Sequence, residues 1–186
     1  MKRVIDLIFA TILCTILIMP MIIIAILIRL TSKGEAIYWS KRVGLNNNIF
    51  NMPKFRTMRI NTPVIATHLL SKKDIHYAPF GYFLRRTSLD ELPQIFSILR
   101  GDMSFVGPRP ALFNQDDLIK LRTKHNVVKL MPGITGWAQV NGRDELSISE
   151  KVNFDLEYMK KKSFLFDVKI LFMTLFKVIR NDGVKH

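Results

Sequence analysis

Two adjacent acids, Asp90 and Glu91, lie in the segment Thr-Ser-Leu-Asp-Glu-Leu-Pro-Gln at residues 87–94. Because proline is tolerated inside a helix only in its first turn, Pro93 predicts a helix that begins near residues 89–90, with both carboxylates at its positive end. In one interpretation the acids only cap this helix, as such residues commonly do. In the other they serve phosphate chemistry. Since consecutive helical side chains diverge by about 100°, one acid can face an electrophilic phosphorus and the other a metal ion.

Basic side chains in other segments are suited to binding phosphate. Arg109 lies between Pro108 and Pro110, and a guanidinium on so rigid a backbone fits bidentate phosphate or carboxylate binding, or a structural ion pair. A glycine-rich segment at residues 132–143, which ends in Arg143, admits a ligand close to its backbone or simply makes tight turns. Further cations occur at Lys54, Arg56, Arg85 and Arg86. Together, acids at a helix start and arginines in loops predict a site for a doubly phosphorylated substrate.

An apolar segment, residues 7–28, precedes these motifs. A straight helix of that length reaches ~33 Å, enough to cross the hydrocarbon core of a bilayer. Pro20 lies near its midpoint and predicts a kink or break near Met19, which would leave two halves too short to cross alone. Lysine and arginine flank both ends, as expected of a re-entrant helix, whereas a single span normally has its positive excess on one side. Hydropathy favours a span and the flanking charges favour a re-entrant helix, so both topologies stay open on composition alone.

The overall charge narrows the class of partner. The chain has 186 residues, 28 Lys and Arg against 15 Asp and Glu, and a formal net charge of +13. This excess indicates an anionic partner: nucleic acid, anionic membrane lipids or a phosphorylated substrate. The longest basic run is only residues 160–162, and the apolar segment directs the protein to a membrane, so we expect no nucleic-acid partner. One cysteine and four histidines without ligand-like spacing argue against a metal site built on those residue types. No pattern in the sequence predicts an oligomeric state.

Short strands and several helices must carry these segments. Periodicity and turn residues predict a small, mostly helical α+β domain with a few short strands. Amphipathic spacing over residues 164–180 predicts a helix that packs on the core or lies in the membrane interface, with Phe172 and Leu175 on its apolar side. The expected strands are residues 36–39 and 49–59, the helices 90–99, 114–125, 147–160 and 164–180, the loops 44–48, 101–110 and 131–143, and the irregular segment 62–78.

Four segments, residues 54–58, 88–94, 101–110 and 132–143, follow the apolar helix in an order that closely resembles the bacterial sugar transferase family, the monotopic phosphoglycosyl transferases. The resemblance covers nearly the whole chain. It implies a nucleotide-diphospho-sugar donor, Mg²⁺ as cofactor, and transfer of a sugar 1-phosphate from a UDP-sugar to undecaprenyl phosphate with release of UMP. Such a reaction is the first membrane step of bacterial glycoconjugate biosynthesis.

The resemblance also implies a topology. Residues 1–32 would form a re-entrant membrane helix that is broken at Pro20, and residues 33–186 a catalytic domain with amphipathic interfacial helices. This domain would lie on the cytoplasmic face of the bacterial inner membrane. The family usually breaks its membrane helix at a Ser-Pro pair, where this chain has Met19 before Pro20.

Roles for individual residues follow from the same resemblance. Asp90 matches the nucleophile that forms a covalent aspartyl-phosphosugar, and Glu91 matches its partner acid at the metal. The basic positions around the substrate phosphates are matched by Lys54, Arg85, Arg109 and Arg143. The alternative from a different class is a non-catalytic, basic, membrane-tethered protein that binds anionic lipid or nucleic acid.

Overall fold

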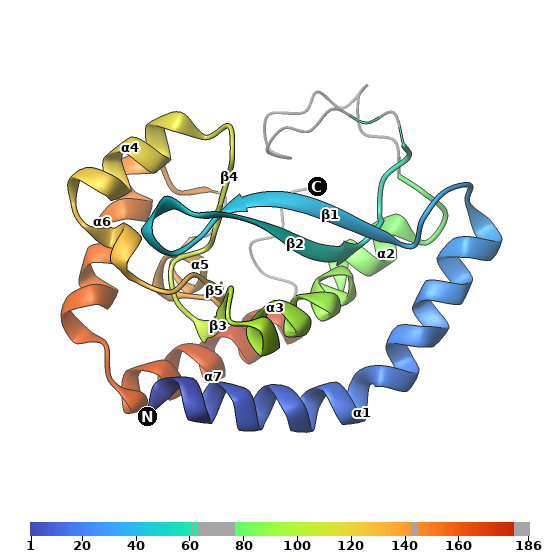
Figure 1. The fold of residues 1–186 in the computed structure, drawn as a ribbon, viewed down its shortest axis with the longest axis horizontal. Coiled ribbons are helices and arrows are strands. Elements are labelled where there is room, and N and C mark those ends of the chain that lie inside the picture. Colours follow the sequence, from blue (N-terminus) through green and yellow to red (C-terminus); the bar gives the residue numbers. More distant parts are fainter. Residues whose placement is uncertain (61, 63–76, 143–144, 181–186) are drawn as a thin grey trace.

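The protein has mixed helical and strand structure and is mostly helical, as predicted (Figure 1). This computed structural model describes residues 1–60, 62, 77–142 and 145–180, so most of the segment expected to be irregular, 62–78, lies outside the described residues. The α-helices are α1 Lys2–Thr31, α2 Gly81–Arg86, α3 Ile95–Arg100, α4 Asp116–Lys124, α5 Trp137–Val140, α6 Ile148–Lys161 and α7 Phe164–Arg180. The strands are β1 Ile37–Val43, β2 Ile49–Phe55, β3 Ser104–Val106, β4 Ala111–Leu112 and β5 Gly133–Thr135, and short 3₁₀ helices are η1 Leu45–Asn47, η3 Leu89–Gln94 and η4 Val127–Lys129.

An antiparallel hairpin forms the larger sheet. Strands β1 and β2 pair along their whole length, and β4 joins the other edge of β1, which gives the order β2-β1-β4. The turn between β1 and β2 places Asn46 and Asn47 in the left-handed region, at φ 53° and 63°, which asparagine tolerates better than most residues. This agrees with the turn predicted at residues 44–48.

A second, parallel pair of strands corrects two of the predictions. Residues 101–110 and 131–143 were expected to be loops, but they contain β3 and β5, which pair with each other, and the short helix α5. Each strand has three residues, too few for an alternating pattern to be visible in the sequence. The helix expected over residues 90–99 is also divided, into η3 and α3, with Pro93 inside the 3₁₀ part.

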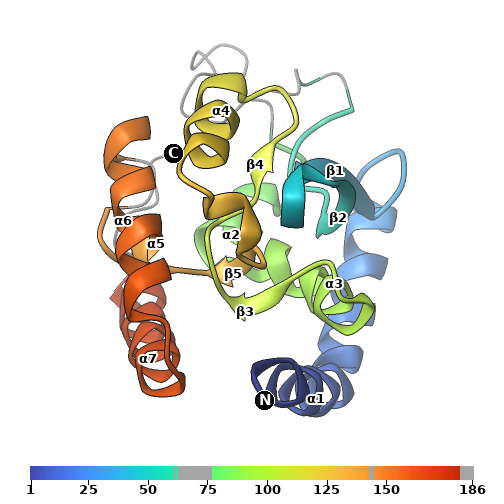
Figure 2. The same cartoon turned by 60° about the vertical axis from the view of Figure 1, so that its left-hand side comes forward.

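The membrane-type helix α1 packs along the domain. It contacts α3, and Ala10, Met21 and Ile28 are buried in a cluster that includes Met52 of β2 and Ile98 of α3. Figures 1 and 2 show α1 along one edge of the molecule, and Figure 1 shows α4 and α6 at the end of the hairpin where β1 turns into β2.

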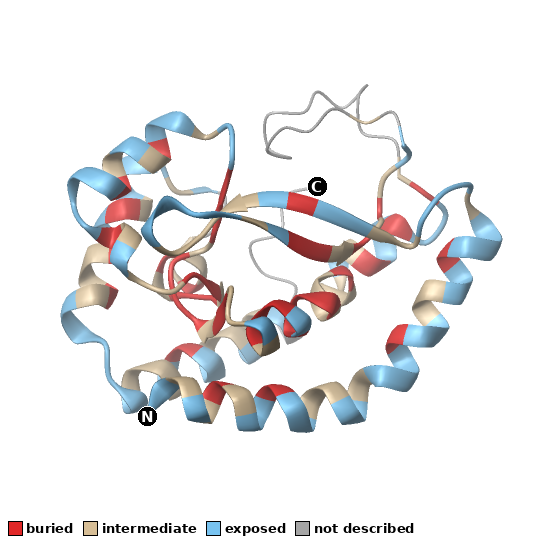
Figure 3. Cartoon of the chain, viewed as in Figure 1, coloured by how far each residue is buried: buried red, intermediate tan, exposed pale blue. Residues whose placement is uncertain are grey.

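Most of the remaining surface of α1 is apolar and exposed. It is the one helix, in the part of the chain that the structure describes, that is long and apolar enough to cross a membrane. Ile16 and Met19 are each 64% exposed, and Figure 3 shows that exposed positions far outnumber buried ones along the helix. The helix continues through Pro20, and in Figure 1 its ribbon changes direction part-way along. Such a surface is suited to acyl chains and poorly suited to water.

The C-terminal helix α7 divides its surface in the same way. Ile170 is fully buried in a cluster with Tyr158 and Val106. Phe172 and Leu175, on the side expected to be apolar, are more than half exposed. That side therefore does not pack on the core of the chain, which leaves the membrane-interface interpretation open.

The start of α1 is attached to parts of the chain that are distant in sequence. The ammonium group of Lys2 donates hydrogen bonds to the carbonyl of Val106 at 2.9 Å and to the Tyr158 hydroxyl at 3.0 Å, and it pairs with the Asp167 carboxylate of α7. Arg3 donates to carbonyls near the C-terminal end of α3, at 2.7 and 3.2 Å. The polar side chains at the start of α1 are thus bound to β3, α3, α6 and α7.

The end of α1 is attached to the same domain. The guanidinium of Arg56, just after β2, donates to the Ser32 hydroxyl at 2.7 Å and also to the Lys33 carbonyl. Arg56 was expected among the phosphate-binding cations, but in the structure it holds the chain that leaves α1. Both ends of the apolar helix therefore lie on one domain.

Candidate active site

The acidic pair begins the 3₁₀ helix η3. Ser88 precedes the helix in the left-handed region, at φ 57°, and makes no side-chain capping hydrogen bond. Asp90 is buried, at 7% exposure, whereas Glu91 is intermediate. The helix start predicted from Pro93 is confirmed, and the two acids have different surroundings, as different chemical roles would require.

Glu91 connects two cations from distant parts of the chain. Its Oε1 atom accepts from the Lys54 ammonium group at 2.8 Å and from Nη2 of Arg109 at 2.7 Å. Lys54 comes from β2, which packs against η3, and Arg109 follows β3. All three side chains are largely buried, so these charge-assisted bonds fix their positions more firmly than exposed pairs would. Burial lowers the pKa of Lys54, Glu91 raises it, and Arg109 lowers it further.

Asp90 depends on the same cations for its charge. Burial raises the pKa of its carboxyl above the ordinary value. Lys54 acts against this shift, as do Arg85 and Arg109, while the charge of Glu91 adds to it. The sequence predicted that both acids lie at the positive end of a helix. In the structure the opposing influence comes from the surrounding cations.

Three consecutive carbonyls hold the backbone around Arg109. Pro108 accepts from the amide of Gly133 at 3.0 Å, Arg109 from Nη1 of Arg122 at 2.7 Å, and Pro110 from Nη1 of Arg42 at 3.1 Å. Burial, and then the charge of Arg109, lowers the pKa of Arg42 to about 10. The donors come from β5, α4 and β1, so three separate elements fix the position of the main chain from which the Arg109 side chain extends.

Glycines in two segments, residues 101–110 and 132–143, allow close packing. A Cβ atom at Gly133 would lie 2.1 Å from the amide nitrogen of Gly107, and one at Gly136 would lie 2.1 Å from the Gly107 carbonyl oxygen. Only glycine lets the two backbones approach so closely. This contact brings residues 132–136 against the segment that carries Arg109.

The structure brings most of the predicted site residues together. Glu91 contacts Lys54 and Arg109 directly, and Asp90 lies within the electrostatic influence of all of these and of Arg85 at the end of α2. Arg143 lies outside the described residues. The roles assigned to these residues stay predictions, since proximity alone does not test them.

Sequence reasoning missed Arg42 and Arg122. Arg122 follows buried Leu118 by four residues, so the two share one face of α4. An apolar residue at that spacing was the available signal that this face is buried. Arg42 follows buried Ser40 by two residues in β1, on the same face of the strand.

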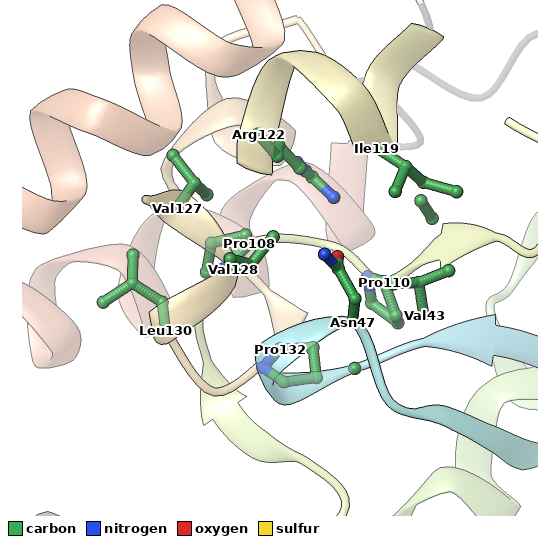
Figure 4. Close-up of a pocket in the computed structure, with 12 residues that line it drawn as sticks. Val43, Asn47, Pro108, Pro110, Ile119, Arg122, Val127, Val128, Leu130 and Pro132 are labelled. Carbon is green, nitrogen blue, oxygen red and sulfur yellow. The ribbon is translucent and has the colours of Figure 1, made fainter. Parts of the chain in front are cut away.

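A small, mostly apolar pocket lies beside the backbone of Arg109 (Figure 4). Its lining includes Pro108 and Pro110, the η4 residues Val127 and Val128, and the side chain of Arg122. The acidic pair is not part of this lining. The pocket therefore lies against the prolines that flank Arg109 and is not formed by the carboxylates.

Comparison of the sequence with known proteins shows the family to which the chain belongs. The model of the bacterial sugar transferase family matches residues 1–181, and the chain belongs to this family. Over 190 residues it is 38% identical to the UDP-glucose:undecaprenyl-phosphate glucose-1-phosphate transferase of Escherichia coli K12, covering 98% of this chain and 41% of that protein. An undecaprenyl-phosphate galactose phosphotransferase of Salmonella typhimurium is 38% identical over 166 residues, covering 81% of this chain and 34% of that protein.

Relatives of this chain differ in length. A sugar transferase of Bacillus subtilis 168, EpsL, is 36% identical over 188 residues, which cover all of this chain and 90% of that protein. By contrast, the chain spans only about two-fifths of the Escherichia coli transferase.

Proposed function

We propose that this protein transfers a sugar 1-phosphate from a UDP-sugar to undecaprenyl phosphate and releases UMP, as the first membrane step of bacterial glycoconjugate assembly. The observation that carries the proposal is the buried Asp90 beside Glu91, whose carboxylate holds Lys54 and Arg109 at 2.8 and 2.7 Å. The names of the Escherichia coli and Salmonella relatives support the donor and acceptor classes. A non-catalytic lipid-binding protein has no need for a buried acid among paired cations.

In the first step the Asp90 carboxylate attacks the phosphorus that carries the sugar. An Asp90 oxygen–phosphorus bond forms, the bond to the bridging oxygen between the two phosphates breaks, and UMP leaves with that electron pair. In the second step an oxygen of undecaprenyl phosphate attacks the same phosphorus, and the aspartate is released unchanged. The covalent intermediate divides one difficult transfer into two easier steps, and UMP leaves before undecaprenyl phosphate attacks the phosphorus.

The cations supply the conditions for both steps. Asp90 must be ionised to attack, and Lys54, Arg85 and Arg109 oppose the rise in pKa that its burial causes. The same cations can bind the phosphate oxygens of the donor and stabilise charge on departing UMP. Arg143, assigned to this task by the family resemblance, would add a further guanidinium.

The donor set fits Mg²⁺ bound together with the substrate. Among the described residues no group of three or more His, Cys, Asp or Glu side chains could hold a metal ion. Mg²⁺ is commonly bound through one or two carboxylates plus substrate phosphates and water, so Glu91 would hold it jointly with the diphosphate of the donor. When bound, the ion supplies charge that stabilises the leaving phosphate.

The attachments of α1 support a re-entrant topology. Lys2 at its start and Ser32 just beyond its end are both held by one polar domain. A helix that crossed the bilayer would carry its two ends to opposite faces, about 30 Å apart, where a single domain on one side cannot bind both. We therefore propose that residues 1–32 enter and leave the cytoplasmic leaflet of the inner membrane and that residues 33–186 lie on its cytoplasmic face, with α7 in the interface.

Cysteine labelling tests this topology. In a Cys14→Ser background, single cysteines placed next to Lys2 and next to Lys33 should both resist a membrane-impermeant thiol reagent in intact cells and react after lysis. Labelling of only one of them in intact cells would establish a true span.

A UMP-release assay with a panel of UDP-sugars tests the reaction. Purified protein with Mg²⁺ and undecaprenyl phosphate should release UMP, and the panel identifies the sugar. Asp90→Asn should reduce turnover to background because a neutral amide is not a nucleophile for phosphorus. The matched control is Asp117→Asn, an exposed acid in the first turn of α4, which should keep full activity.

Intact-mass analysis tests the intermediate separately. Wild-type protein incubated with donor and Mg²⁺, without acceptor, should gain the mass of one phosphosugar, and the adduct should map to Asp90. Appreciable activity in Asp90→Asn, or an adduct on another residue, would disprove the mechanism while leaving the overall reaction intact. Absence of UMP release with every donor would instead favour the non-catalytic interpretation.

A further inference from the structure

A buried ion pair connects α4 and α6 behind the site. Nε and Nη2 of Arg122 lie 2.9 and 2.7 Å from Oδ2 of Asp155, and the two side chains are only 10% and 2% exposed. Burial raises the pKa of Asp155, and the neighbouring guanidinium lowers it. Neither residue belongs to the motifs that carry the family resemblance.

The third donor group of Arg122 is directed at the active-site segment. Its Nη1 atom donates to the main-chain carbonyl of Arg109 at 2.7 Å. The neighbours of Arg109 are Pro108 and Pro110, which have no amide hydrogen, so this stretch is held mainly through its carbonyl groups. The bond from Arg122 falls on the one residue of the stretch whose side chain reaches Glu91.

We propose that Arg122, held in place by Asp155, is a positioning residue that sets the guanidinium of Arg109 against Glu91 and the donor phosphates. The inference rests on the proposed transfer reaction. Arg122 donates to the main chain of Arg109, so it acts on the position of the main-chain atoms from which that side chain extends. A shift of about 1 Å at that point is enough to impair catalysis strongly.

The energetics of buried ion pairs favour a geometric role. Desolvation of two charges offsets much of their attraction, and well-packed apolar side chains of similar volume often give equal or greater stability. The surroundings are suitable for such a replacement, because Leu118, Val127 and Val152 form an apolar cluster along the same two helices and η4. What apolar side chains cannot supply is the donor to the Arg109 carbonyl.

A double-mutant cycle separates positioning from stability. The apolar pair Arg122→Met with Asp155→Leu should lower kcat/KM for UMP release roughly 10- to 100-fold while the protein stays folded. In an Arg109→Ala background the same pair should cost less than about threefold more, because the residue through which it acts is gone. The matched control is Val152→Ala, a buried position three residues before Asp155, which should lower the unfolding temperature but change kcat/KM less than about threefold.

A measurement of Arg109 itself decides the matter without relying on turnover. In protein with ¹⁵N-labelled arginine in detergent micelles, the Arg109 Nε signal is assigned by its loss in Arg109→Lys. Asp155→Asn, which keeps the size of the side chain, should shift or broaden that signal, and Val152→Ala should not.

The outcomes are distinct. Wild-type kcat/KM in the apolar pair, an effect that multiplies with that of Arg109→Ala, or an unchanged Arg109 signal in Asp155→Asn would overturn the positioning role. If wild-type protein releases no UMP from any donor, the proposed reaction fails, and the Arg109 signal still tests whether the buried pair fixes its position.

Discussion

Replacing Gly133 with alanine should push residues 132–136 away from the segment that carries Arg109. The new Cβ atom would lie 2.1 Å from the Gly107 nitrogen, 2.4 Å from the Thr135 oxygen and 2.7 Å from the Val106 carbonyl carbon, all main-chain atoms. Ordinary contact begins at 3.4 Å, so the backbones must move apart by about 1 Å or more. No rotation of a side chain can relieve this clash.

The cost follows from the bonds that such a movement breaks. The amide of Gly133 donates to Pro108 at 3.0 Å, and the amide of Gly107 donates to Thr135 at 2.9 Å. Loss of both bonds plus strain should lower the free energy of unfolding by roughly 2–4 kcal/mol. For a protein of this size that is a fall of roughly 5–15 °C in Tm. Displacement of Arg109 with its backbone should also reduce UMP release by roughly 100-fold.

Differential scanning calorimetry in detergent and the UMP assay measure the two effects. Gly44→Ala is the matched control, because there the nearest atoms belong to the Phe50 ring, at 3.0 Å, and a side chain can yield where a backbone cannot. Its Tm and activity should stay near those of the wild type. If Gly133→Ala behaves like the control, the close contact of the two segments does not position the site.

Three further predictions follow from the charges and exposed surfaces. Lys54→Met removes a cation that lowers the pKa of Asp90, so it should move the acidic limb of the kcat pH profile to higher pH. Glu91→Gln removes a charge that raises this pKa, so it should move the same limb to lower pH. Shifts of both variants in the same direction would contradict the assignment of Asp90 as the ionised nucleophile. Pro20→Leu should straighten α1, so that its apolar segment reaches ~33 Å, and expose the N-terminal end of the helix to impermeant reagents, which an unchanged labelling pattern would refute. Leu175→Asp, at a position 56% exposed, should weaken vesicle binding by roughly 2 kcal/mol or more with little change in Tm, and the reverse pattern would place that side of α7 in the core.

Local patterns account for the parts of the fold that the sequence predicts well. The apolar run of α1 and the amphipathic period of α7 are each contained within one segment, so neighbours along the chain are enough to define them. The helix start at Asp90 belongs to the same group, because Pro93 restricts it from only three residues away.

Contacts between distant residues account for what the sequence left out. β3 and β5 pair where Gly133 and Gly107, which follows β3, allow the two backbones to approach closely, and neither segment has a period of its own. Arg122 of α4 and Asp155 of α6 are 33 positions apart in the sequence, so composition gives no sign that they pair. Arg56 shows that residue type alone does not predict a role, because this cation was expected to bind phosphate and instead holds the end of α1.

The bond between Lys2 and Asp167 has a consequence for the order in which the protein is assembled. The two residues are 165 positions apart, so the whole segment between them must be synthesised before Lys2 can pair with Asp167. Arg56, which holds the other end of α1, is made much earlier. During synthesis α1 is therefore made before these partners, gains its anchor at Ser32 next, then the partners of Arg3 and Lys2 in α3 and β3, and the Asp167 partner of Lys2 last. A nascent chain stalled before α7 would leave the beginning of α1 without its partners on that helix, so the final placement of the membrane segment is a late event in biosynthesis.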